Sequence, residues 1–88
     1  MNTDVKREFF IPLSDGEMGK SYKVLESNVE EKIESRLEAL GINKDTIIRV
    51  INKKRCGTMI IKVRGTRFAL GSKISRDIVV EELQDEKE

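Results

Sequence analysis

The sequence predicts a mainly β fold: a small, strongly bent sheet of short strands, closed into a partial barrel and carrying one α-helix. Ten Ile and seven Val make up 17 of the 88 residues, and these β-branched side chains favour strands over helices. Short apolar runs alternate with glycine-containing turns, while residues 29–40 alone show a long helical stripe. A chain of 88 residues has room for one domain with one small core.

The first part of the domain is expected to be extended. An apolar segment, residues 9–13, opens it, and Pro12 confines this segment to an edge or an extended approach. Residues 14–16 are typical of a turn. Residues 21–27 then alternate as a strand does, except at Leu25, which falls on the polar side. A bulge, or a strand buried on both faces, would explain this exception.

The clearest element is a helix over residues 29–40. Asn28 is placed to cap it, and Glu31 at the third helical position would complete a capping box. Its apolar residues recur at spacings of four, four and three positions: Val29, Ile33, Leu37 and Leu40. Gly41 follows directly and is expected to end the helix in a left-handed conformation.

The rest of the domain is expected to be strands joined by short connections. Alternating or β-branched runs predict strands over residues 46–53, 59–63, 66–71 and, after a short helical turn at 72–77, residues 78–83. Between the second and third of these strands, Arg64, Gly65 and Thr66 form a tight turn in which Gly65 needs a positive φ.

The inward positions of these elements predict a core of apolar side chains. The core residues expected are Val24, Ile33, Leu37, Leu40, Ile48, Val50, Ile61, Val63, Phe68, Leu70 and Val80.

Composition and charge narrow the class of protein. A single Cys cannot form an internal disulfide, and no apolar run reaches the roughly 18 residues of a membrane span, so we expect a soluble cytosolic protein. We interpret residues 1–8 as a flexible leader, residues 9–83 as the domain and residues 84–88 as an acidic tail. Net charge is +1, but residues 44–76 hold ten basic residues and one acidic residue.

The residue types present argue against catalysis. The chain lacks His, the commonest general base and metal ligand, so Cys56 has no base to make it a nucleophile, although Lys54 and Arg55 favour its thiolate. A barrel of this size is expected to be filled by side chains, which leaves no pocket for a substrate. No cofactor is expected. Transition-metal binding remains an alternative, and its affinity would be low because the available ligands are mostly carboxylates.

The basic block, residues 44–76, has three interpretations. It is a solvated face, a surface for an acidic protein or anionic headgroups, or the nucleic-acid-binding face of a small barrel. Its one aromatic residue, Phe68, falls on the inward phase of its strand, so the block offers no platform for base stacking. Nucleic acid is therefore kept as the alternative.

Two segments resemble the FeoA family, the small cytosolic partner in bacterial ferrous iron uptake. One is residues 36–42, with the pattern Arg-Leu-x-x-Leu-Gly-Ile, and the other is residues 61–70, a strand, a glycine turn and a strand. The same domain resembles the C-terminal domain of iron-dependent repressors. The resemblance implies an SH3-like barrel of five or six strands with one α-helix inserted after the first strand. It also implies a regulatory or assembly role beside FeoB, a membrane transporter with a cytosolic GTP-binding domain.

From this resemblance we expect partner binding at the end of the helix. The surface predicted comprises Arg36, Leu40 and Ile42, flanked by Arg64 and Arg67 from the later strands. The chain would then act at the inner face of the membrane through its partner.

Overall fold

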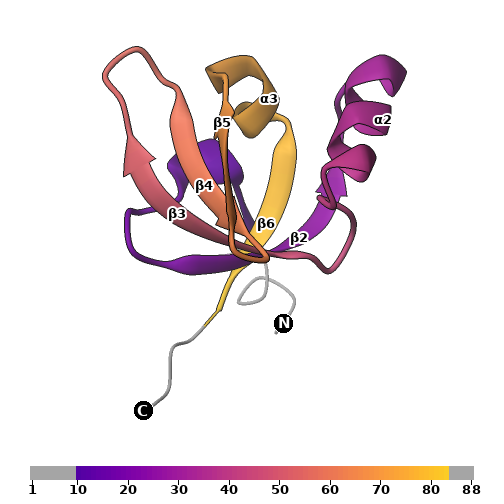
Figure 1. The fold of residues 1–88 in the computed structure, drawn as a ribbon. Coiled ribbons are helices and arrows are strands. Elements are labelled where there is room, and N and C mark those ends of the chain that lie inside the picture. The colour runs from indigo at the N-terminus through magenta and orange to yellow at the C-terminus, as the bar shows by residue number, and fades with distance from the viewer. Residues whose placement is uncertain (1–9, 84–88) are drawn as a thin grey trace, which may run out of the picture.

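The computed structural model describes residues 10–83, which form a six-stranded antiparallel sheet in the order β1-β6-β2-β3-β4-β5. The sheet curves strongly into a small SH3-like barrel, and the longest helix, α2, stands at one side of it (Figure 1). The expected leader and tail, residues 1–8 and 84–88, lie outside the described residues. The predicted fold class is confirmed.

The element bounds agree closely with the sequence analysis from β2 onward. The strands are β1 (Phe10–Pro12), β2 (Ser21–Ser27), β3 (Ile47–Lys53), β4 (Met59–Val63), β5 (Thr66–Leu70) and β6 (Ile78–Glu82). The helices are the 3-10 turn η1 (Leu13–Asp15), α2 (Glu31–Ala39) and α3 (Ser72–Arg76). The irregularity expected at Leu25 is a β-bulge, because the register between β2 and β6 shifts between Val24 and Glu26.

The inward faces of the strands build the core. Eight of the eleven predicted core residues are buried: Val24, Leu37, Ile48, Val50, Ile61, Val63, Leu70 and Val80. Ile33 and Phe68 are only half-buried against that core, and Leu40 is exposed, so these three predictions are wrong or partly wrong. The core also takes in five apolar residues that the analysis did not name: Leu13, Tyr22, Ile42, Met59 and Ile78.

The capping box predicted for the helix is wrong. The N-cap residue of α2 is Glu30, with no hydrogen bond from its side chain, and the helix begins only at Glu31. The reason is the sheet: Ser27 is still paired with Ile78 across β2 and β6, and the Asn28 N–H donates to the Asp77 carbonyl oxygen at 2.7 Å. Asn28 is thus held by the strand ladder and cannot turn back to cap a helix.

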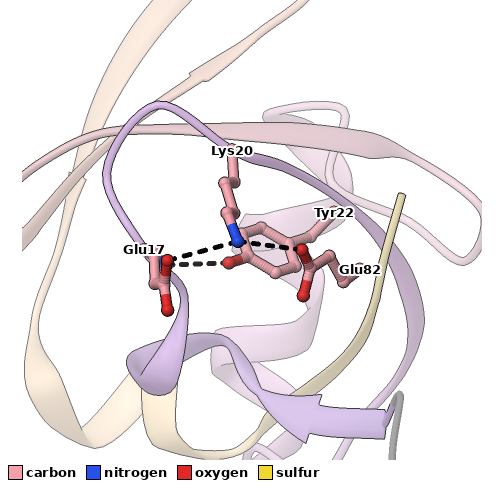
Figure 2. A network of polar contacts seen from close by, with 4 residues as sticks. All are labelled: Glu17, Lys20, Tyr22 and Glu82. Atoms are coloured by element: carbon pink, nitrogen blue, oxygen red, sulfur yellow. Dashed lines mark hydrogen bonds and ion pairs between the residues drawn. The ribbon is translucent and has the colours of Figure 1, made fainter. Parts of the chain in front are cut away.

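A polar network fastens the loop before β2 to the C-terminal strand (Figure 2). The Lys20 ammonium lies 3.3 Å from a Glu17 carboxylate oxygen and 3.1 Å from a Glu82 carboxylate oxygen. Hydrogen bonds to Glu82 first, and then to Glu17, raise the pKa of Lys20 above its ordinary value. Below them, the buried Tyr22 hydroxyl accepts a hydrogen bond from the Glu17 N–H at 2.8 Å. The network is structural: it holds residues 17–20 against β2 and β6.

Candidate partner-binding surface

The C-terminal end of α2 is shaped by a glycine. Gly41 has φ +89°, and its N–H donates to the Glu38 carbonyl oxygen at 3.0 Å. The Ile42 N–H donates to the Leu37 carbonyl oxygen at 2.8 Å, which completes a Schellman motif. The left-handed end predicted at Gly41 is confirmed. It reverses the chain sharply and brings Ile42 back under the helix beside Leu37.

This reversal decides which predicted partner contacts are accessible. Ile42 is 4% exposed and packs in the core, as the residue after a Schellman glycine commonly does against the helix it follows. Ile42 therefore cannot reach a partner, and its place in the predicted surface is corrected. Leu40, predicted for both the core and the surface, is 41% exposed because it is the C-cap residue, past the turn that packs on the sheet. Arg36, one turn earlier, is exposed.

Thr46 holds the loop that follows in a fixed shape. Its hydroxyl donates to the Gly41 carbonyl oxygen at 3.1 Å and accepts from the Asn43 N–H at 2.9 Å, while the residue is only 7% exposed. The backbone around it pairs with β2, since the Asp45 N–H donates to the Val24 carbonyl oxygen at 2.7 Å. The helix end and its exposed Leu40 are thus held on a rigid support.

The turn between β4 and β5 brings a guanidinium to the helix end. Arg64 and Gly65 have φ of +52° and +86°, the two positive values that a type I′ hairpin turn requires, and Val63 pairs with Thr66 across it. The positive φ predicted for Gly65 is confirmed. A Cβ built on Gly41 would lie 3.8 Å from Arg64 Nη1, so the guanidinium rests over the helix C-terminus, where a positive charge is favoured. The structure therefore brings Arg64 to Gly41, the residue that follows Leu40, from a distant part of the sequence.

Arg67 faces a different set of neighbours. It lies opposite Lys62 in the β4–β5 pairing, and Lys62 lies opposite Arg49 in the β3–β4 pairing. All three side chains are exposed. We call Arg49, Lys62 and Arg67 the basic row. Sequence analysis grouped Lys62 with Arg64 and Arg67 along the sheet in the basic block but left Lys62 and Arg49 out of the partner surface, although the alternation of each with buried neighbours on its strand signals an outward side chain.

An open hollow lies beside the basic row. Its volume is about 530 Å³, and it is lined by residues 45–47 together with Arg49, Lys62, Arg64 and Gly65. Ile47, 47% exposed, supplies an apolar surface among these cations. The hollow therefore connects the basic row with Arg64, the residue that rests on the helix end.

A second hollow, of about 660 Å³, contradicts the expectation that no pocket of substrate size exists. This hollow is a groove between α2, α3 and the β3–β4 loop. Val29, Ile33 and Ile74 give it apolar walls, and the exposed Cys56 lies at its edge. Cys56 Sγ is 3.4 Å from the Thr58 hydroxyl, which can donate to the thiolate; this contact first, and Lys54 last, lower the pKa of the thiol.

The described residues hold no further reactive arrangement. Within residues 10–83, no group of three or more Cys, Asp and Glu side chains is placed to hold a metal ion. The pKa of Cys56 is lowered, but the chain has no histidine that could act as a base for this thiol. No helix among these residues combines the length and apolar character that a membrane crossing would need. The surface features that remain are suited to binding.

Comparison with known proteins gives one family match and a consistent set of structural relatives. The FeoA domain family model matches residues 11–82. No curated protein sequence matches the chain. A crystal structure of an iron uptake regulatory protein, FeoA, is 27% identical with a TM-score of 0.75, covering 84% of this chain and 97% of that one. A FeoA-like protein from Clostridium acetobutylicum is 26% identical with a TM-score of 0.75, covering 90% and 93%.

More distant relatives share the fold alone. A manganese-dependent transcriptional repressor is 20% identical with a TM-score of 0.77, and the match covers 84% of this chain but only 42% of the repressor. The small domain therefore also occurs as one part of a longer regulatory protein.

Proposed function

This chain belongs to the FeoA domain family, and from that premise we propose that it is an accessory protein of ferrous iron transport that docks on the cytosolic part of a FeoB-type transporter. The observation that carries the proposal is the family match over residues 11–82, nearly the whole described domain. Membership of the family implies involvement in ferrous iron transport. The transporter as the direct partner, and a place at the inner face of the membrane, are our own steps beyond it.

A binding role, without catalysis, is supported by the chemistry of the chain. The family is a small accessory domain and is not known as an enzyme family. The core consists almost entirely of aliphatic side chains, and the chain has no histidine to serve as a base for its one thiol. Regulation of a partner needs only a surface that distinguishes between the partner's states.

The docking surface that we propose comprises Arg36, Leu40, Arg64 and Arg67. Leu40 provides an exposed apolar centre, and the arginines provide a charged rim, which is the usual anatomy of a protein interface. The Schellman end and the Thr46 hydrogen bonds hold Leu40 in place before binding, so little conformational entropy is lost on docking.

The test is binding of the purified chain to the transporter's cytosolic domain, with and without guanine nucleotide. We expect the double variant Arg64→Glu and Arg67→Glu to slow association and reduce its salt dependence, because both residues lie on exposed positions of the hairpin. Lys32→Glu with Arg76→Glu makes the same charge change on the two helices and should leave the association rate nearly unchanged.

A second variant separates docking from folding. Leu40→Ala should weaken binding while leaving thermal unfolding nearly unchanged, because the side chain is largely outside the core. Absence of binding in every nucleotide state, with tight and salt-sensitive binding to RNA or DNA, would replace this proposal with the nucleic-acid alternative.

A further inference from the structure

The basic row places three positive charges side by side on the outer face of the sheet. The register sets Arg49 opposite Lys62 and Lys62 opposite Arg67, on three neighbouring strands. Directly opposite side chains on antiparallel strands have Cβ atoms about 4.5–5.5 Å apart, and like charges at such positions destabilise a sheet. The row therefore costs stability in the isolated protein, and an anion against this face would remove that cost.

Asp45 is the one carboxylate that lines the hollow beside the row, and no ion pair within residues 10–83 joins Asp45 or any other carboxylate to Arg49, Lys62 or Arg67. Both ion pairs found within residues 10–83 involve Lys20, on the other side of β3 in the sheet order. The acidic helix α2 stands at the right of the view in Figure 1, apart from β3 and β4 at the left. The charges of the row are available to a ligand from outside.

An exposed apolar side chain accompanies the row. Ile47 is two residues before Arg49 on β3, so both side chains are on the same face of the sheet. Ile47 is 47% exposed and lines the open hollow of about 530 Å³ with Arg49 and Lys62. Apolar and basic side chains on one surface are also the combination with which amphipathic helices bind at the boundary between lipid headgroups and acyl chains.

Other anionic partners fit this face less well. Nucleic acid would be expected to find stacking side chains, but Tyr22 is buried and Phe68 is half-buried against the core. The hollow is open and carries cations on several sides, with no narrow cavity that would select one acidic side chain. Lipid headgroups can move laterally to meet separate point charges, so they need no preformed pocket.

We propose that the outer face of β3–β5 binds the anionic phospholipid headgroups of a membrane surface. The basic row contacts the phosphates, and Ile47 enters the interface between them. The net charge of +1 gives the whole molecule little attraction to an anionic membrane, so binding depends on this face being turned toward it. The inference does not depend on the transporter, because the ligand is the lipid surface itself.

Co-sedimentation with lipid vesicles tests the proposal on the full chain. We expect binding to vesicles of phosphatidylcholine mixed with phosphatidylglycerol at low ionic strength, and little binding to phosphatidylcholine alone. Near a membrane surface each Lys or Arg strengthens binding about fivefold. Lys62→Gln should therefore weaken partitioning about fivefold, and Arg49→Gln with Lys62→Gln roughly 25-fold. The single variant Ile47→Ser should also weaken partitioning onto the anionic vesicles, but without changing the salt dependence of that partitioning.

The matched control carries the same net charge as the variant Arg49→Gln with Lys62→Gln. Lys32→Gln with Arg76→Gln removes two exposed charges from α2 and α3 and should leave partitioning unchanged. Thermal unfolding of each variant confirms that it is folded. An equal loss in the control variant, no preference for anionic vesicles, or no vesicle binding at low ionic strength would each overturn the proposal. Arg67 belongs to both proposed surfaces, whereas Arg49, Lys62 and Ile47 lie outside the docking surface, so variants at these three positions test lipid binding separately from docking.

Discussion

The two ends of helix α2 are built in different ways. At its N-terminus, Glu30 makes no side-chain capping bond, and Asn28 is held by a backbone hydrogen bond to Asp77. At its C-terminus, the conformation of Gly41 closes a Schellman motif within the helix itself. The C-terminal end depends on a residue type that can adopt positive φ. The N-terminal end depends on where a strand from the other end of the domain stops pairing.

The two helix ends show which local sequence signals still predict the structure once tertiary contacts have formed. A glycine at a helix end adopts positive φ without the steric cost that a Cβ would impose, so tertiary structure leaves its signal intact. An asparagine before a helix has several hydrogen-bonding alternatives, and pairing between β2 and β6 settles which one is used. Substitutions at the two ends should therefore have unequal effects.

The largest effect is expected at the point where the C-terminal end meets the core. Leu37→Ala should lower the free energy of unfolding by about 2–5 kcal/mol, because Leu37 is 3% exposed and packs with Ile42 in the core cluster. Chemical denaturation measures the change. Leu40→Ala, three residues on, is the control and should cost much less. A similar loss of unfolding free energy in both variants would show that Leu40 packs against the core in solution.

A smaller loss is expected from the loop that supports this end. Thr46→Val keeps the shape of the side chain but removes its hydroxyl, so the Asn43 N–H and the Gly41 carbonyl oxygen each lose a partner. We expect about 1–3 kcal/mol of destabilisation. Thr46→Ser retains the hydroxyl and should recover most of it in the same denaturation experiment. Equal free energies of unfolding for the Val and Ser variants would show that the hydroxyl's hydrogen bonds do not stabilise the loop.

The Schellman glycine itself should contribute through its backbone. Gly41→Ala forces a Cβ into a left-handed conformation and should cost about 1–2 kcal/mol, although space for the Cβ exists. Gly71→Ala is the matched control: its φ is −70° and nothing lies within 4 Å of the added Cβ. That variant should be neutral or stabilised by up to about 1 kcal/mol. Thermal unfolding of the pair isolates the cost of positive φ.

The smallest effect is expected at the N-terminal end of the helix. Asn28→Ala should change the free energy of unfolding by less than about 0.5 kcal/mol, since only the backbone of Asn28 is used. Equilibrium denaturation is again the measurement. A loss of about 1 kcal/mol or more would mean that the side chain does cap the helix in solution, and the contrast between the two ends would disappear.

The same division applies to the surfaces. The resemblance over residues 36–42 placed Arg36 and Leu40 on the predicted partner surface, and the structure leaves both exposed. Ile42 was assigned to the surface from the resemblance over residues 36–42, but the chain reversal at Gly41 turns its side chain into the core. Lys62 was grouped with Arg67 from the sequence, but the row that Arg49 completes across three strands was missed because it exists only once the register is known.

By itself, the sequence determined the features that depend on neighbours along the chain. Alternating apolar residues placed β2, β4 and β6 closely, and Gly41 and Gly65 marked the two backbone reversals, because side-chain direction and positive φ are local properties. Only the tertiary structure decided which outward residues meet. The guanidinium of Arg64 over Gly41, the basic row and the groove beside Cys56 each join segments far apart in sequence. Their positions follow from sheet register and curvature, which result from packing of the whole core and not from any one segment.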